Sequence, residues 1–147
     1  IGPAAGHLAS GLKAHGRMSE PATLFGQIRL LLTRTGALQG KRVVVTAGGT
    51  QEQIDPVRVI TNRSSGKQGY ALAQACLDQG AEVILIAAPN ALPAPTGAQH
   101  VPVTSAKEME TTVLQHCQTA DALLMAAAVA DFTPANPSAQ KIKKRAG

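Results

Sequence analysis

Aromatic residues are nearly absent from this chain of 147 residues, which contains two Phe, one Tyr and no Trp. Proteins that bind single-stranded nucleic acid stack the bases on aromatic rings, so this scarcity argues against a nucleic-acid partner. Apolar residues still make up 44% of the chain, and they must build its core from Ala, Val, Leu and Ile. Such a core suits helices packed on a parallel sheet.

Long apolar runs are also missing, because none approaches the roughly 18 residues that a membrane-spanning helix needs. The first residues lack the charged and hydrophobic regions of a signal peptide. The two cysteines, Cys76 and Cys117, have no CxxC spacing and fall inside apolar helical patterns, which indicates buried free thiols. We therefore expect no membrane association and a cytoplasmic protein.

Several motifs of hydrolytic enzymes do not occur. The sequence has no HExxH, no paired-Cys metal site and no GxSxG, so zinc hydrolysis and Ser-His-Asp chemistry have no support. The segment TAGGT after a valine run is superficially similar to an NAD(P)-dependent reductase, but Tyr70 is followed four residues later by Gln74 rather than lysine. That reductase and a non-catalytic nucleotide-binding or oligomerisation module remain as alternatives.

The net charge of +5 is concentrated near the end of the chain. Much of the excess comes from Lys141, Lys143, Lys144 and Arg145. A basic segment without aromatic residues fits a polyphosphate or an acidic small molecule, although a lysine run is also typical of a solvated tail.

The chain divides into three parts by pattern. Residues 1–18 are rich in Gly, Ala and His without a period and indicate an arm. Residues 19–40 contain an amphipathic helix that starts near Ser19 and Pro21 and ends near Gly36. Residues 41–147 alternate apolar runs with helical patterns, which predicts one α/β domain that we expect to be truncated.

The apolar runs of this domain predict a Rossmann-like, three-layer fold with a mainly parallel sheet, preceded by the arm and the short helix. Buried strands are expected at residues 42–46, 82–87 and 122–129, and a short strand is expected at 100–103. A helix capped by Ser64 or Ser65 runs to Asp78, and its expected inward face is Ala71, Leu72, Ala75 and Cys76. A second helix starts at a capping box formed by Ser105 and Glu108.

The candidate site lies where such sheets bind ligands, beyond the carboxyl ends of the strands. Loops 48–66 and 89–97 and the segment from Ala130 onward should converge there. Gly48, Gly49, Ser64 and Gly66 surround a helix N-terminus that can hold a phosphate or carboxylate. The alternative is an ordinary strand-to-helix turn.

Charged and amide side chains add to this site. Arg58, Asn62 and Arg63 lie in the long loop between residues 50 and 63 and can orient a carboxylate, although loop solvation explains them equally well. Asp131 follows the last apolar run, at a strand end where ribose hydroxyls are commonly bound. A helix cap is its other interpretation.

Three blocks of sequence together resemble a known family. They are KRVVVTAGGTQEQIDPVRVITNRSSGKQGYALA, AAAVADF and KIKK, which span residues 41–144 in that order. They resemble the ligase part of the bacterial bifunctional coenzyme A biosynthesis proteins, which fuse a phosphopantothenoylcysteine decarboxylase to a phosphopantothenate-cysteine ligase. Residues 6–21, GHLASGLKAHGRMSEP, look like the end of the flavin-dependent decarboxylase domain, so 1–18 would be its tail.

The resemblance implies a ligase that uses CTP and Mg²⁺ to convert 4'-phosphopantothenate into an acyl-cytidylate, which cysteine then attacks. It also implies a homodimer through the ligase domain and a higher assembly in the full fusion. FMN would belong to the fused decarboxylase and is not expected in this chain. The metal ligands stay unassigned.

The same resemblance assigns roles to individual residues. Lys141 would stabilise charge on the phosphates during acyl-cytidylate formation, and Asn62 would act on the intermediate in the second half-reaction. Arg58 and Ala128 would bind phosphopantothenate. The cytidine would be held by Asp131 and the strand end Met125, Ala126 and Ala127.

Two departures qualify this picture. Ser10 occupies the position where the family's decarboxylase motif commonly has cysteine. The ligase's remaining nucleotide-contacting lysines should lie beyond Gly147, so we expect this chain alone to lack full activity.

Overall fold

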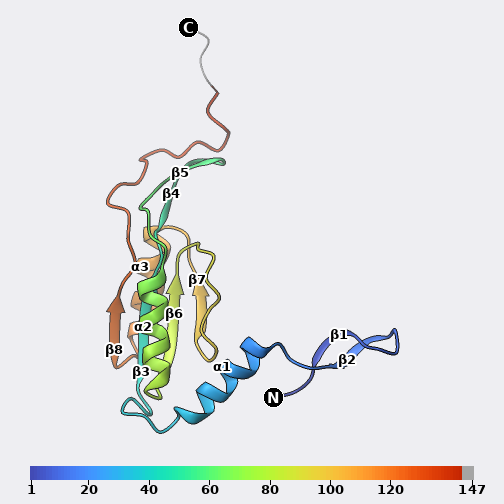
Figure 1. The fold of residues 1–147 in the computed structure, drawn as a ribbon. Helices are drawn as coiled ribbons and strands as arrows, with labels where there is room; N and C mark the ends of the chain where they lie inside the picture. The colour runs from blue at the N-terminus through green and yellow to red at the C-terminus, as the bar shows by residue number, and fades with distance from the viewer. Residues whose placement is uncertain (144–147) are drawn as a thin grey trace.

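The computed structural model describes residues 1–143 of the chain (Figure 1). In chain order their elements are β1 (Ala4–His7), β2 (Lys13–Arg17), α1 (Pro21–Leu32), β3 (Arg42–Ala47), β4 (Gln51–Asp55), β5 (Arg58–Thr61), α2 (Lys67–Asp78), β6 (Glu82–Ala87), β7 (Gln99–Pro102), α3 (Ala106–Cys117) and β8 (Ala122–Met125). Among these described residues, no helix has the length and apolar character to cross a membrane.

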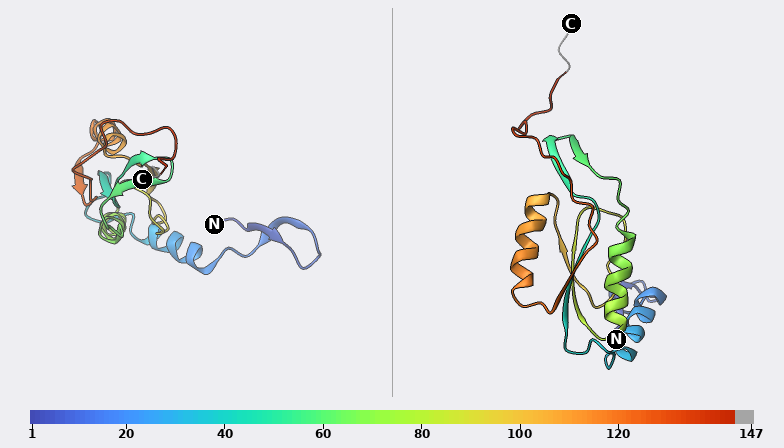
Figure 2. Two further views of the ribbon diagram at one scale, coloured as in Figure 1. Left: turned by 90° about the horizontal axis from the view of Figure 1, so that it is seen from above. Right: turned by 90° about the vertical axis from the view of Figure 1, so that its left-hand side faces the viewer.

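The centre of the fold is a four-stranded parallel sheet in the order β7-β6-β3-β8. Helices α2 and α3 cover its opposite faces, as Figure 2 shows in the view from the side. The arrangement confirms the predicted α/β fold with a mainly parallel sheet. The β3 strand lies between β6 and β8, with Val44 paired to Ile84 on one side and Leu123 on the other.

The valine run of β3 supplies both faces of the core. Because successive side chains of a strand point to opposite faces, Val43 and Val45 pack with α2 residues in one cluster. Val44 packs in the other cluster with Met109 and Val113 of α3. All three valines are almost fully buried, which explains why the run is apolar without alternation.

Helix α2 differs from its prediction at its start and on its buried face. Its N-cap is Gly66 in the left-handed region, and no serine side chain caps it. The hydroxyls of Ser64 and Ser65 instead accept from the amides two residues further on, at 3.4 Å each, as in a local serine turn. The buried residues are Gly69, Tyr70, Ala73, Cys76 and Leu77.

Of the four residues expected on the inward face of α2, only Cys76 is buried. Leu72 is partly buried and packs on the core, whereas Ala71 and Ala75 are exposed. Alanine fits either side of a helix at little cost, so the Ala-rich pattern did not determine the rotation of the helix. The capping box of Ser105 and Glu108 at the start of α3 is confirmed.

The long loop expected between residues 50 and 63 is largely an antiparallel hairpin of β4 and β5. Its turn is closed by the Asp55 carboxylate, which accepts from the amides of Val57 and Arg58 at 2.9 and 3.0 Å. The hairpin projects beyond the C-terminal edge of the sheet (Figure 1). It was missed because β4 is rich in Gln, Glu and Asp, which are uncommon in strands.

Strand β8 is shorter and more exposed than predicted. It ends at Met125 rather than Val129, and it forms an edge of the sheet. Leu123 and Met125 are 37% and 69% exposed, so the run from Ala122 to Val129 is not a buried strand in the described residues. An apolar run has the same sequence pattern whether its outer side is covered or open.

Residues 1–18, which were expected to form an irregular arm, contain regular secondary structure. Strands β1 and β2 pair as an antiparallel hairpin that extends away from the sheet (Figure 2). Helix α1 follows, with Glu20 rather than Ser19 at its N-cap, and it ends at Leu32 rather than near Gly36. It is attached to α2 through an ion pair in which Arg29 donates to Asp78.

Candidate functional site

Two segments that are far apart in sequence meet at the C-terminal edge of the sheet. The glycine turn after β3 lies beside the segment after β8, with Gly49 and Ala128 forming a parallel bridge. The Ala128 amide donates to Gly48 at 2.8 Å, and the Thr50 amide donates to Ala128 at 3.2 Å. The predicted phosphate turn and the predicted cytidine segment are therefore neighbours.

Two buried threonines fix the segment after β8. The Thr46 hydroxyl accepts from the amides of Ala126 and Ala127 at 3.1 and 3.2 Å. The Thr50 hydroxyl accepts from the Ala130 amide at 2.8 Å. Both threonines are fully buried, so these hydrogen bonds are shielded from water.

These threonines were missed by sequence reasoning. Their partners lie about 80 residues further along the chain, and no local motif connects them. The available signal was weak: Thr46 is the one polar residue among the buried positions of β3, where a hydroxyl needs a partner.

Asn62 lies at the same edge. Its side-chain amide donates to the Val129 carbonyl at 3.0 Å, and its side chain is exposed. The backbone of Asn62 also approaches the glycine turn, because a Cβ built on Gly49 would lie 2.6 Å from the Asn62 carbonyl oxygen. A larger residue at Gly49 would push Asn62 away from the segment after β8.

The start of α2 completes the rim of the candidate site, a name we use for the glycine turn after β3, Asn62, the segment after β8 and this helix start. Gly66 has φ of 72°, and a Cβ placed on it would lie 3.5 Å from the Gly48 Cα and 3.6 Å from the Asn90 Cγ. The loop after β3, the helix N-terminus and the loop after β6 therefore converge, as expected. Ser64 lies next to this point as a turn residue rather than as a helix cap.

Arg58 is held by the turn of the β4–β5 hairpin. Its guanidinium donates to the Asp55 carboxylate through Nε at 2.9 Å and through Nη2, and Nη2 also donates to the Ile142 carbonyl at 3.2 Å. Hydrogen bonding from Arg58 holds the pKa of Asp55 well below its ordinary value, although burial opposes this shift. Asp55 was not identified from the sequence.

The remaining predicted residues are exposed or half-buried. Met125, Asp131 and Lys141 lie on the surface, and Ala126, Ala127 and Ala128 are half-buried. Two further residues of the basic segment, Lys144 and Arg145, lie outside the described residues. Ser10 lies in the turn between β1 and β2, on the hairpin that extends away from the sheet.

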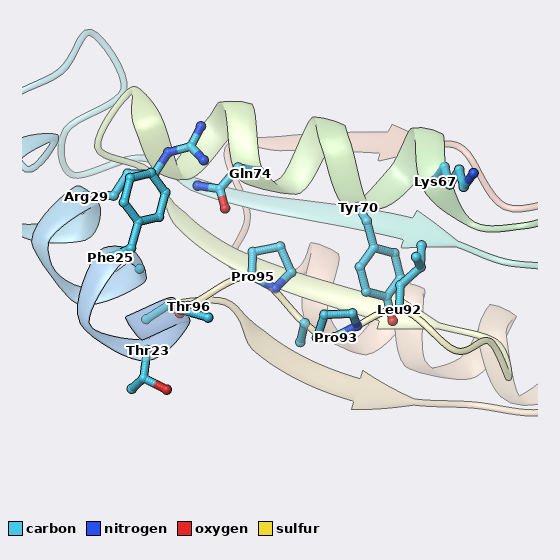
Figure 3. Close-up of a pocket in the computed structure, with 13 residues that line it drawn as sticks. Thr23, Phe25, Arg29, Lys67, Tyr70, Gln74, Leu92, Pro93, Pro95 and Thr96 are labelled. Atoms are coloured by element: carbon cyan, nitrogen blue, oxygen red, sulfur yellow. The ribbon is translucent and has the colours of Figure 1, made fainter. Parts of the chain in front are cut away.

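Two cavities flank α2. One of about 500 Å³ lies at the carboxyl ends of β6 and β7, where Ala88, Asn90 and Thr104 line it. It adjoins the rim. A second, of about 570 Å³, lies between α1, α2 and the loop 92–96, and Figure 3 shows Phe25 and Tyr70 on its walls.

Metal-ligating side chains do not cluster in residues 1–143, where no group of three or more His, Cys, Asp or Glu residues is placed to hold a metal ion. Mg²⁺ is commonly bound by one or two carboxylates together with substrate phosphates, so its ligands stay unassigned. The acidic residue nearest in sequence to the segment after β8 is Asp131, which is exposed and single.

Comparison with known proteins gives consistent results. Residues 38–147 match the family described as DNA/pantothenate metabolism flavoprotein C-terminal domain. The coenzyme A biosynthesis bifunctional protein CoaBC of Mycobacterium tuberculosis is 49% identical over 97% of this chain, which corresponds to 35% of that protein. The chain thus spans about a third of the length of the curated relatives that it matches.

Solved structures agree with the fold. The crystal structure of the C-terminal domain of a CoaBC is 52% identical, covers 67% of this chain and 50% of that chain, and has a TM-score of 0.64. A Cab2 mutant in complex with phosphopantothenate-cysteine is 19% identical, covers 83% of this chain and 54% of that chain, and has a TM-score of 0.60. The second likeness concerns the fold alone.

Proposed function

Because the chain belongs to the DNA/pantothenate metabolism flavoprotein C-terminal domain family, we propose that it forms the nucleotide-binding part of a CTP-dependent phosphopantothenate-cysteine ligase. The observation that carries the proposal is the convergence of Gly49, Asn62 and Ala128 at one edge of the parallel sheet. Similarity to CoaBC over nearly the whole chain supports coenzyme A biosynthesis as its context. Within this proposal, residues 1–18 are the tail of a decarboxylase domain.

The proposed reaction has two steps. A carboxylate oxygen of 4'-phosphopantothenate attacks the α-phosphate of CTP, which forms the acyl-cytidylate and releases pyrophosphate. The cysteine amine then attacks the acyl carbon, an amide forms, and CMP leaves with the bonding electrons while the amine loses a proton. Mg²⁺ bound to the triphosphate would neutralise part of its charge.

The chain's own groups would orient these reactants. The half-buried backbone from Ala126 to Ala128, fixed by the Thr46 hydroxyl, provides a rigid surface for the cytidine, next to the exposed Asp131. The amides at the start of α2 offer partial positive charge to a phosphate. Lys141 contributes a full positive charge that stabilises the developing negative charge on the phosphates.

Asn62 and Arg58 would serve the pantothenate side. The Asn62 side chain is held by the Val129 carbonyl and can donate its second amide hydrogen to the acyl oxygen of the intermediate. The exposed half of Arg58 can bind phosphopantothenate together with Ala128.

We also propose that the protein forms a homodimer in the cytoplasm. Among the described residues, exposed apolar side chains occur on α1 and on the β4–β5 hairpin, as well as on β8 and the segment after it. Phe25 and Leu32 of α1 are 65% and 78% exposed, and Val57 and Val59 of the hairpin are 60% and 44% exposed. Burial of such surfaces is a common driving force for association. Light scattering of the complete gene product tests this point.

The experiment for the reaction measures pyrophosphate release by the complete gene product with CTP and 4'-phosphopantothenate. We expect Lys141→Gln to lower the single-turnover rate at least about a hundredfold, as loss of a charge-stabilising group does in other enzymes. Lys107→Gln is the matched control, because Lys107 is an exposed lysine on α3 that pairs only with Glu110 among the described residues.

Normal pyrophosphate release by Lys141→Gln would contradict the role of this lysine. A wild-type protein that releases no pyrophosphate from CTP would contradict the reaction itself. In that case thermal-shift titrations with CTP, ATP and NADP separate a nucleotide-binding module from a reductase, because only a bound ligand raises the melting temperature.

A further inference from the structure

Asp55 is a buried carboxylate at the turn of the β4–β5 hairpin. Its side chain is fully buried, and it accepts hydrogen bonds from two amides of its own turn. It also accepts from the Arg58 guanidinium and, at 3.1 Å, from the amide of Ile142, a residue 87 positions further along the chain. The last contact has no role in closing the turn.

The segment that contains Ile142 is attached to the hairpin at two points. The amide of Ser138 donates to the Ile54 carbonyl at 2.9 Å, and Ile142 is bound by Asp55. Between these points the Ser138 hydroxyl donates to the Gln140 carbonyl at 2.6 Å, which tightens the chain locally. Lys141 lies between the two attachments and is exposed.

Arg58 links the same partners. Its Nη2 group donates both to Asp55 and to the Ile142 carbonyl, so the peptide groups on both sides of Ile142 are held. A guanidinium bound through two nitrogens to a carboxylate keeps a fixed orientation. Asp55 therefore sets the position of Arg58 and of the basic segment together.

We propose that Asp55 is a positioning residue that docks the basic segment 141–143 on the β4–β5 hairpin and holds Lys141 and Arg58 on one surface. The docking stands on the geometry alone. Its consequence for catalysis rests on the proposed function, in which Lys141 acts on the phosphates and Arg58 on phosphopantothenate. Without this attachment, the lysine must be ordered in every reaction cycle, at an entropic cost.

An Asp55→Asn variant separates charge from size. One carboxylate oxygen serves the two amides of the turn, and the other serves Arg58 and Ile142. An asparagine side chain has only one oxygen. Either this oxygen accepts from the turn amides and the NH₂ group faces Arg58 and Ile142, or the NH₂ group faces the turn and the turn loses its acceptor. In the first orientation the segment is released while the turn is kept.

The direct test is hydrogen exchange of residues 138–143 in the complete gene product, measured by mass spectrometry. We expect the Ile142 amide to exchange at least about tenfold faster in Asp55→Asn, since hydrogen bonds to charged groups are the stronger ones. Asp121→Asn is the control, because Asp121 also binds an amide and a lysine but lies at the opposite edge of the sheet. It should leave exchange in 138–143 unchanged.

The functional test is the single-turnover rate of pyrophosphate release from CTP. We expect Asp55→Asn to lower this rate about tenfold and to raise KM for 4'-phosphopantothenate, which a loss of stability alone would not do. Asp121→Asn should change neither. Unchanged exchange at Ile142 overturns the docking, and faster exchange with normal kinetics overturns the positioning role.

A second variant covers the possibility that Asp55→Asn does not fold. Ile142→Pro removes the single N–H that Asp55 accepts from the segment and leaves the buried turn intact. We expect it to increase exchange of the Lys141 and Lys143 amides and to lower the rate as Asp55→Asn does. If wild-type protein does not use CTP, the proposed function fails, while the exchange result still decides whether Asp55 docks the segment.

Discussion

The Thr50 hydroxyl accepts a hydrogen bond from the Ala130 amide at 2.8 Å and thereby joins the glycine turn after β3 to the segment after β8. The two residues are 80 positions apart, and Thr50 is fully buried. The Thr50 amide also donates to Ala128, so one residue holds the segment through its side chain and its backbone. The rim of the proposed site depends on this contact.

Thr50→Val tests that dependence, because valine keeps the shape of threonine and removes the hydroxyl. The Ala130 amide then loses its acceptor, which should cost about 1–3 kcal/mol of stability. We expect a lower free energy of unfolding in urea and weaker CTP binding. Thr111→Val is the control, since the Thr111 hydroxyl only donates to Lys107 within the exposed side of α3. Equal effects of the two variants would contradict the argument.

Gly69 is required by the close packing of α2 on β3. A Cβ at this position would lie 2.5 Å from the Ala47 Cβ and 2.7 Å from the Thr46 carbonyl oxygen, and the strand backbone cannot move aside cheaply. We expect Gly69→Ala to destabilise the fold by about 2 kcal/mol, although alanine favours helix formation. Gly2→Ala, which would meet nothing within 4 Å, should leave the urea midpoint unchanged.

The elements that the sequence predicted well have strong local patterns. Strands β3 and β6 each contain a run of apolar residues, at 43–45 and 83–87, and the capping box of Ser105 and Glu108 marks the start of α3. Strands β4 and β5 were not predicted. Strand β4 consists mostly of polar residues, and the turn between the two strands has no Asn-Gly or Asp-Gly pair to mark a hairpin.

The site follows the same division. The loop that carries Gly49 and Asn62 could be placed at this edge, because the carboxyl ends of parallel strands meet there, whereas Ala128 was named through the family resemblance. Thr50 and Asp55 could not be identified, because their partners Ala130 and Ile142 are brought to them only by the folded chain. Sequence pattern locates a rim, but tertiary contacts decide which polar residues hold it.

The two thiols should differ in reactivity. Cys76 is buried among the side chains between α2 and the sheet, and this burial raises the pKa of its thiol. Cys117 is only half-buried at the end of α3. Because the thiolate is the reacting form, we expect alkylating reagents to label Cys117 well before Cys76 in the native protein at mildly alkaline pH. Mass spectrometry of the labelled peptides measures the order, and faster labelling of Cys76 would contradict it.

The low pKa of Asp55 predicts how stability depends on pH. Hydrogen bonding from Arg58 holds the folded-state pKa of this carboxyl well below its ordinary value of 3.8. A carboxyl with a depressed pKa stabilises the fold above its unfolded-state pKa, and this contribution is lost as the pH falls toward the folded-state value. At neutral pH the contribution is fully present.

We therefore expect the difference in unfolding free energy between wild type and Asp55→Asn to be constant above about pH 5 and to shrink progressively from about pH 4 downward. Urea titrations of the complete gene product across this range measure it. The docking of Ile142 should weaken over the same range, because a charged carboxylate accepts the Ile142 amide more strongly than the protonated acid does. A stability difference that does not change with pH would show that Asp55 is not held ionised by Arg58.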